Sequence, residues 1–586
     1  MCRSTRCDLS TGAQSSEPSR LARTNGGFSL LMVMLFIGLG LLLMTGVLNY
    51  SSANSTATDR YNEYYTTLAA AEAATEKVVG NISRHFHNSG VPGVDSQLVN
   101  LANLYPTGAE LASAGLADEW GNYDFLNPGG GNNSTYVAKV ANELYTGLNW
   151  KYAGFFGSNA TYRIISNVRR ASSGRNIVAA LRQDVQVASI PLFEFGIFYA
   201  LDMEISPSQD MTLTGRVHCN TNIYASPSNP RIVTFAGDVT SAHKILRQPH
   251  PDDGPRTPPF AVNFLAAQDW NVASLKLPIG RTNAPNTLAP NTPAALREII
   301  NIPPSAESPT SLLGKQRYYN KADLIILVTN ATPPISATDR NGVSVPAVTN
   351  FVSVATNTFY NVRENATIQS TVIDIQAFTS QYGALGNPKI IYVADRRYTN
   401  AGVRIINGQT LPGPLTIATM NPLYVKGHYN ASDLTPGSTN TSATKPASLI
   451  ADAITLLSGS WDDSNSTNSL PSRQASDTTI NAAVIAGIVP SNGGSYSGGV
   501  ENFIRLLEQW GFSRTLTFNG SIVALYESQI ATGPWGGVGV YSPPLRRYAF
   551  DGNFGAGNVA KLPPGTPYLR TLIRGQWVIT QANASL

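Results

Sequence analysis

The chain has 586 residues, a formal net charge of +4 and only 13% charged residues, compared with about 25% in an average soluble protein. This composition, with 50 glycines and 37 prolines, is typical of an exported protein rich in strands and turns, and it argues against a helical cytoplasmic enzyme. So small a surplus of positive charge, without a basic cluster, gives no reason to expect a nucleic-acid partner. The length leaves room for roughly two to four domains.

The first element is an uncharged apolar run from Phe28 to Leu48. As a helix, a run of about 20 residues is long enough to cross a bilayer. A secretory signal would have an apolar core of about 7–15 residues followed by a small-residue cleavage site, whereas this run is longer and Leu48-Asn49-Tyr50-Ser51 is a poor cleavage site. The basic residues before the run predict a cytoplasmic N-terminal end; they are Arg3, Arg6, Arg20 and Arg23. We therefore expect a membrane anchor with the rest of the chain outside the cytoplasm.

The junction in front of the run, Gly26-Gly27-Phe28-Ser29-Leu30-Leu31, resembles the processing site of type IV prepilins. The resemblance implies that residues 1–27 are a leader, that a prepilin peptidase cleaves after Gly27, and that Phe28 becomes the new N-terminus. Met32 stands where that family usually has the glutamate that major pilins use in assembly. Its absence fits a minor, tip or accessory subunit. An uncleaved signal anchor and a secretory signal remain the alternatives.

Residues 28–88 are predicted to form one transmembrane and stalk helix, because no proline occurs between Phe28 and Phe86. The stretch from Tyr61 to Val79 is rich in alanine and glutamate, which favour helix. Four of its residues recur at spacings of three and four and should share one face; they are Leu68, Ala71, Thr75 and Val78. The segment LAAAEAATEKVV within this stretch resembles the end of the N-terminal helix in PilX-type minor pilins.

Residues 89–202 are predicted to be a mixed α/β region with a β-hairpin. A short helix is expected at Tyr136 to Leu148. Residues 162–168 and 176–187 flank a Ser-Ser-Gly turn and should pair as a hairpin. Phe193 to Tyr199 is dense in aromatic residues and should be a strand buried on both sides.

Residues 203–586 are predicted to be a mainly β body of short strands separated by Gly, Asn and Pro turns. No regular helix alternates with these strands, which argues against a doubly wound α/β fold, and a parallel β-helix fits best. A β-sandwich is the alternative. Surface insertions are expected at about 250–313 and 437–468, and an amphipathic helix at Gly499 to Gly511. Leu415 to Ile417 and Leu423 to Gly427 should be adjacent rungs joined at Asn421-Pro422.

The body also carries a family resemblance. The stretches TGRVHCNTNIYA and TFAGDVTSAHKI, followed later by PLTIATMNPLYVKGHYN, INAAVIAGIVP and LTFNGSIVALYES, resemble bacterial PilX-like proteins with a β-helical body. The resemblance implies a membrane-tethered, pilin-like surface protein, and it implies no catalytic residue.

Few residues have the spacing of a catalytic or metal site. His85 and His87 are two apart and do not share a helical face. His218 and Cys219 would point to opposite faces of a strand. Cys219 would be the one cysteine left after loss of a leader carrying Cys2 and Cys7, and we expect it to be buried. The neighbouring carboxylates would likewise face opposite ways; they are Asp252-Asp253 and Asp462-Asp463.

A calcium-loop reading also fails on its spacing. Asp463, Asn465 and Thr467 imitate the start of such a loop, but Asn468 replaces its glycine and Gln474 its final glutamate. His428 should bond backbone groups at the end of a rung. We therefore expect a non-enzymatic protein with no catalytic residue, cofactor or metal, whose processing residues are Gly27 and Phe28.

The sequence thus predicts a pilin-like, minor or tip/accessory surface protein with a structural or adhesive role in a type IV pilus or a type II secretion-like system. Its expected partners are membrane lipid, other pilin-like subunits and a prepilin peptidase. Its expected location is a single pass through the inner membrane with the body outside the cytoplasm, at the cell surface or in a pilus. The alternative is a tethered β-helix that binds or cleaves extracellular polysaccharide, which a carboxylate cluster or a row of exposed aromatic residues on the body would favour. A third option is an anchored protein with no link to pilus machinery.

Overall fold

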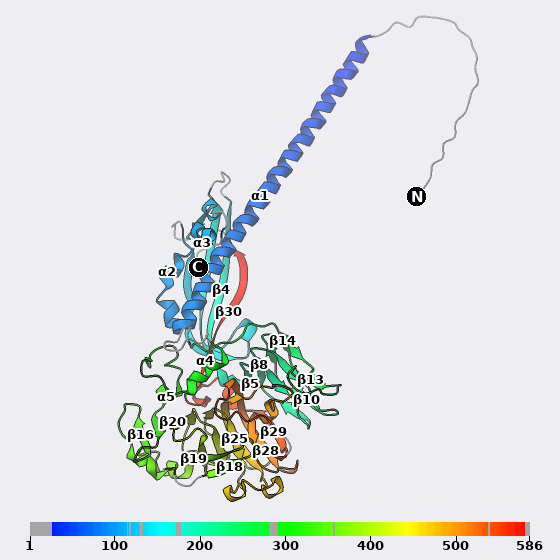
Figure 1. Cartoon of the computed structure of the whole chain (residues 1–586). Coiled ribbons are helices and arrows are strands. Elements are labelled where there is room, and N and C mark those ends of the chain that lie inside the picture. Colours follow the sequence, from blue (N-terminus) through cyan, green and yellow to red (C-terminus); the bar gives the residue numbers. More distant parts are fainter. Residues whose placement is uncertain are drawn as a thin grey trace, which may run out of the picture.

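The computed structural model describes residues 26–113, 115, 119–127, 133–171, 177–279, 291–354, 358–536 and 539–580. Figure 1 shows three parts: a long projecting helix, an antiparallel sheet packed on the second half of that helix, and a larger β body beyond it. The expected leader (except Gly26 and Gly27) and the Ser-Ser-Gly turn lie outside the described residues.

Helix α1 (Gly26–Asp95) is the single long helix of the described chain. The apolar side chains from Phe28 to Leu48 are all exposed. Farther along, the predicted packing face is confirmed, because Leu68, Ala71, Thr75 and Val78 are all buried. The helix kinks near its end, where Gly90 has a φ of 70° and Pro92 follows.

An antiparallel sheet packs on the second half of α1, and we call the two together the head. Its strand order is β1-β3-β4-β30, and β2 pairs with β3 on the same side as β1, farther along the strand. The strands are β1 (Tyr123–Leu126), β2 (Tyr136–Gly147), β3 (Phe156–Arg170), β4 (Val178–Pro191) and β30 (Tyr568–Thr580), and two short helices, α2 (Leu98–Ala102) and α3 (Gly108–Ser113), follow α1. Ile82 and Phe86 of α1 are fully buried against Tyr162, Ile164 and Val187 of β3 and β4. The predicted hairpin is present as β3 and β4.

The helix predicted at Tyr136 to Leu148 is wrong, because this segment forms strand β2. Its side chains are mostly exposed. The strand is therefore held by backbone pairing with β3, and this long-range pairing overrides the local helix propensity.

The first half of the body winds in three-sided turns, with every strand pair parallel. Its strands are β5 (Phe195–Tyr199), β6 (Met203–Ile205), β7 (Met211–Leu213), β8 (Arg216–Cys219), β9 (Ile223–Ala225), β10 (Ile232–Phe235), β11 (Val239–Ser241), β12 (Ile245–Leu246), β13 (Ala261–Phe264) and β14 (Gln268–Trp270). Every third strand stacks on the same side, so the three sides run β5-β8-β11-β14, β6-β9-β12 and β7-β10-β13. The predicted buried strand is confirmed, since all five residues of β5 are buried.

The second half of the body alternates between two sheets. One sheet contains β15 (Leu324–Val328), β20 (Ile390–Asp395), β22 (Leu415–Thr419), β24 (Ala447–Ala451), β26 (Thr478–Ile488) and β28 (Thr515–Glu527). The other contains β19 (Ala366–Asp374), β21 (Ala401–Ile406), β23 (Leu423–Lys426), β25 (Ile454–Leu457) and β27 (Ile504–Leu506). These strands all pair in parallel, unlike the antiparallel strands of an ordinary sandwich.

Smaller elements complete the body. They are the edge strands β16 (Ile335–Asp339), β17 (Val352–Ser353), β18 (Thr358–Asn361) and β29 (Leu545–Phe550) and the short helices α4 (Pro293–Arg297), α5 (Tyr318–Lys321) and α6 (Ile375–Gln381). Strand β28 pairs in parallel with β5, which joins the two halves into one 12-stranded sheet. We call residues 195–550 the coil.

Two local expectations within the coil are corrected. Leu415–Thr419 and Leu423–Lys426 are not adjacent rungs, because they lie in different sheets and form two sides of one turn around the corner at Asn421. The helix expected at Gly499 to Gly511 is a 3-10 turn at Val500–Asn502 followed by β27. Its apolar residues mimic a helical stripe since both faces of this segment are buried, and pairing with β25 decides in favour of a strand.

Candidate functional site

The predicted processing junction lies at the free end of α1. Gly27 and Phe28 are in the first turn of the described helix, and the Phe28 side chain is 69% exposed. Met32, in the position of the expected glutamate, is exposed as well. By length and composition α1 can cross a membrane, and its apolar window is not buried in the described structure. An N-terminal apolar helix of this kind is consistent with a membrane anchor or a signal.

A second candidate site is a cleft of about 530 Å³ on the coil, where the two halves meet. Four carboxylates line it; they are Asp202, Glu204, Asp252 and Glu527. Asp202 lies in the corner between β5 and β6, Glu204 is the middle residue of β6, and Glu527 ends β28. His250 and Lys276 complete the charged lining. We call this the acidic cleft.

A histidine and a carboxylate are paired inside the acidic cleft. His250 Nδ1 accepts the backbone N–H of Asp252 at 3.1 Å, so the proton of the neutral ring is on Nε2. His250 Nε2 then donates to Asp202 Oδ2 at 3.3 Å. The other oxygen of Asp202 accepts the backbone N–H of Asn222 at 2.9 Å, which fixes the carboxylate in place.

Glu204 forms the buried wall of the acidic cleft. Its two carboxyl oxygens accept a hydrogen bond from the Ser491 hydroxyl, each at 2.8 Å from Ser491 Oγ. Burial raises the pKa of this carboxyl above its usual value. Glycoside hydrolysis uses a pair of carboxyl groups, and the general acid of the pair has a raised pKa.

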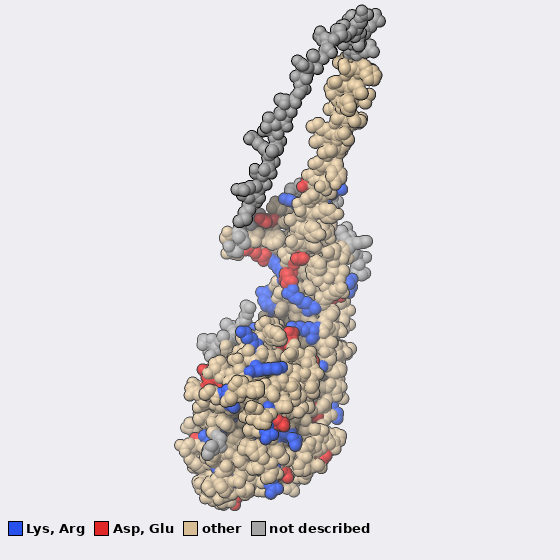
Figure 2. All heavy atoms as spheres, turned by 90° about the vertical axis from the view of Figure 1, so that its right-hand side faces the viewer, with Lys and Arg blue, Asp and Glu red and all other residues tan. Residues whose placement is uncertain are grey.

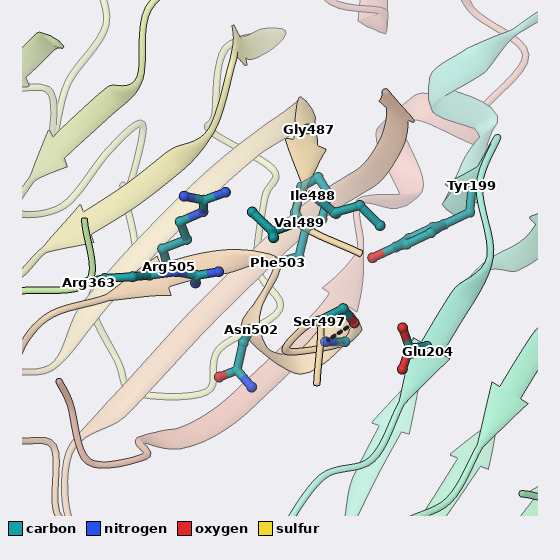
Figure 3. A pocket seen from close by; sticks show the side chains of 11 residues that line it. Tyr199, Glu204, Arg363, Gly487, Ile488, Val489, Ser497, Asn502, Phe503 and Arg505 are labelled. Atoms are coloured by element: carbon teal, nitrogen blue, oxygen red, sulfur yellow. Dashed lines mark hydrogen bonds between the residues drawn. The ribbon is translucent and has the colours of Figure 1, made fainter. Parts of the chain in front are cut away.

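Glu204 also borders a small enclosed chamber of about 10 Å³, roughly the space of one water molecule. Figure 3 shows the Tyr199 hydroxyl pointing into this chamber, with Glu204 and Ser497 near it and Arg505 on its far side. The Tyr199 hydroxyl is buried and has no hydrogen-bond partner among the described residues. Burial also raises the pKa of Tyr199 well above its usual value. Arg505 is used structurally, since it donates to Glu364 Oε1 at 2.9 Å.

The carboxylate pairs noted in the sequence are not brought together as dyads. Asp252 faces the acidic cleft, whereas Asp253 pairs with Arg256 at 2.8 Å. Asp463 pairs with Arg404 at 2.8 Å and accepts the indole N–H of Trp461, also at 2.8 Å.

Cys219 and the histidines considered in the sequence analysis have structural partners. Cys219 is fully buried, as predicted, and burial raises the pKa of its thiol to about 12. His218 is buried between Thr240 and Asn220. His428 Nδ1 accepts the backbone N–H of Thr479 at 3.1 Å, as predicted. His85 and His87 both lie within α1, where His87 Nδ1 bonds Ser83 O at 2.8 Å.

Sequence reasoning missed most of the acidic cleft. Asp202 and Glu527 are more than 300 residues apart and meet because β28 pairs with β5. No local sequence pattern predicts the pairing of β28 with β5. The one available signal was Asp202-x-Glu204 immediately after a strongly predicted strand.

Comparisons with known proteins add little to this geometry. No protein-family model matches the sequence, and no curated protein matches it. Among solved structures, the competence-associated pilin ComZ from Thermus thermophilus is similar over 76% of this chain and 87% of its own, with 10% sequence identity and a TM-score of 0.26.

Proposed function

We propose that the protein is a pilin-like, membrane-anchored minor or accessory subunit that displays a parallel β-helical coil outside the cytoplasm. The observation that supports this most is the division of α1: from Phe28 to Leu48 it is apolar and exposed along its whole circumference, while its second half packs on an antiparallel sheet. An exposed apolar helix of this length is stable only in a bilayer or against other apolar helices. Its partners would be membrane lipid, other pilin-like subunits and a prepilin peptidase.

The role we propose is structural or adhesive, in a type IV pilus or a type II secretion-like system, and involves no catalysis. Met32 supplies no carboxylate near the start of the helix, and the first acidic residue after Phe28 is Asp59. This favours a minor, tip or accessory position over that of the bulk filament subunit.

Processing at Gly27 gives the direct test. The full chain would be co-expressed with a prepilin peptidase, as wild type, Gly27→Ala and the matched control Gly26→Ala. We expect intact-mass and N-terminal sequencing to find Phe28 at the N-terminus of the wild type and of the control, and the unprocessed chain for Gly27→Ala. A wild-type chain that keeps Met1 in the presence of an active peptidase would contradict the proposal.

The acidic cleft favours one second candidate, binding or cleavage of an extracellular polysaccharide. Its four carboxylates and the raised pKa of Glu204 are the observation behind it. The test is release of reducing ends from a panel of polysaccharides, together with pull-down on the insoluble ones, for wild type, Glu204→Gln and Asp202→Asn. An exposed acidic residue outside the cleft, Asp462, provides the control Asp462→Asn. Activity or binding that survives both cleft substitutions would rule this candidate out.

A further inference from the structure

A third cavity, of about 200 Å³, lies at the junction of head and coil, and no part of the proposed function uses it. One wall is the β2–β3 connection of the head, with Lys151, Tyr152 and Phe155. The other is the outer face of the sheet β5-β8-β11-β14. The segment Ser274–Lys276 separates this junction pocket from the acidic cleft, since Leu275 lines the pocket and its two neighbours line the cleft.

The floor of the junction pocket is centred on His218, which is uncharged, and ends at the acidic Asp269. In register across four strands, Phe198, His218, Thr240 and Asp269 form one outward-facing row. His218 stacks on Phe198 with ring centroids 5.4 Å apart. Its Nε2 faces Asn220 Oδ1 at 3.0 Å and its Nδ1 faces the Thr240 hydroxyl at 2.8 Å, so neither ring nitrogen is left for a ligand. Burial lowers the pKa of His218 to about 4, so the ring is uncharged at neutral pH.

The positively charged guanidinium of Arg216 lines the same pocket in a fixed orientation. The Arg216 guanidinium lies 4.3 Å from the centroid of the Phe155 ring, and this stacking limits its orientation. Its nearest carboxylate, Asp238 Oδ2, is 3.7 Å from Nε, beyond hydrogen-bond distance. Arg216 makes no side-chain hydrogen bond with a described residue. Its fork of donors is therefore free for a carboxylate, which a guanidinium can bind through two parallel bonds.

The remaining lining limits the choice of ligand. Asp238 and Asp269 would repel a compact dianion such as phosphate, but carboxylates accept hydrogen bonds from hydroxyl groups. A neutral sugar would leave the Arg216 donors unused. The volume is below the roughly 300–1,000 Å³ of sites for drug-sized ligands, so it suits one ring. Lys151, on the head side, adds a second positive charge.

We propose that the junction pocket binds one hexuronate ring, with Arg216 holding its carboxylate and Asp238 and Asp269 accepting its hydroxyls. Figure 2 faces the side of the molecule that carries β14, and Lys and Arg side chains gather across the waist between head and coil, where an acidic polysaccharide chain would lie. This inference does not depend on pilus assembly or on the acidic cleft.

The test is calorimetric titration of the full-length protein in detergent micelles with sodium glucuronate and with glucose. These two probes differ only in having a carboxylate or a hydroxymethyl group. We expect glucuronate to bind at least about tenfold more tightly than glucose, and Arg216→Gln to abolish the difference. Arg231→Gln is the matched control, because Arg231 lies on the same half of the coil, outside the pocket.

Three outcomes would overturn the proposal: no binding of glucuronate, equal binding of the two probes by the wild type, or unchanged glucuronate binding by Arg216→Gln. The comparison of glucuronate with glucose on the wild type still tests the proposal if Arg216→Gln does not fold. Glu204→Gln should leave glucuronate binding unchanged. The result for the junction pocket can therefore be told apart from the result for polysaccharide binding or cleavage in the acidic cleft.

Discussion

The buried carboxyl of Glu501 makes the stability of the coil depend on pH, and Glu501→Gln should remove part of that dependence. Glu501 lies in the turn before β27 and is only 3% exposed. Its Oε1 accepts the backbone N–H of Ser206 at 3.1 Å and the hydroxyl of Tyr496 at 2.9 Å. These bonds and the nearby Arg546 favour the ionised form, but burial outweighs them and raises the pKa of Glu501 from 4.5 to about 7.

Proton linkage determines whether the protein becomes more or less stable as the pH rises. The folded-state pKa lies above the unfolded one, so the folded protein holds the proton more tightly. The resulting stabilisation is fully present below about pH 4.5 and is lost as the pH rises through about 7. One pKa unit is worth about 1.4 kcal/mol, so the whole effect is about 3 kcal/mol, of which about 2 kcal/mol falls between about pH 5 and about pH 7.5. A glutamine is neutral throughout and contributes none of this change.

The assay is the melting temperature of the full-length protein in detergent at these two pH values. The wild type should lose several degrees more than Glu501→Gln between about pH 5 and about pH 7.5. Burial also raises the pKa of Glu194 and of Glu508 to about 7, so the wild type and Glu501→Gln both keep some pH dependence. The quantity to compare is therefore the slope of melting temperature against pH for the two proteins. The control is Glu143→Gln, an exposed site that should keep the wild-type slope. Equal slopes for wild type and Glu501→Gln would refute the reasoning.

Three further changes test other contacts. Phe86→Ala empties a fully buried site between α1 and the head sheet and should cost about 3–5 kcal/mol, visible as faster amide exchange in the second half of α1. Arg297→Met leaves the fully buried Asp452 carboxylate without its cation; it should destabilise the coil by about 3–5 kcal/mol, and adding Asp452→Asn should recover part of the lost melting temperature. Gly520→Ala should sharply reduce the yield of folded protein, because its Cβ would lie 1.9 Å from the carbonyl oxygen of Ala482.

Local patterns in the sequence were enough to predict elements that depend on local interactions. The apolar run, the alanine-rich packing face of α1, the β3–β4 hairpin and the buried strand β5 all have their signal within a short window. The backbone of α1 leaves helical geometry at Gly90, close to the predicted end at residue 88, and a short second helical segment then runs to Asp95.

The elements that were missed depend on partners far away in the chain. Residues 136–147 form a strand because β3 offers a pairing edge. Ile504–Leu506 form a strand because β25 offers a pairing edge. Apolar residues on both faces of this segment give a sequence pattern that resembles the apolar face of a helix. The acidic cleft and the junction pocket arise only when β28 closes on β5 and the head meets the coil. Propensity and spacing carry no information on such contacts, since the strands on either side of them could be paired in many orders.

The coil is connected to the head, and so to α1, through two strands that lie side by side. The coil begins after β4 and the chain returns to the head as β30, directly beside it: Leu192 N donates to Pro567 O at 2.9 Å, and Tyr568 pairs with Pro191. The coil is therefore an insertion between two neighbouring antiparallel strands. Strand β30 is also tied to the helix, since its Arg574 pairs with Glu76 of α1. A force that pulls the coil away from α1 enters the head through both strands at their shared end, and the packing of α1 on β3 and β4 must resist it. Phe86 lies in this packing, so Phe86→Ala should weaken the attachment of the body to α1.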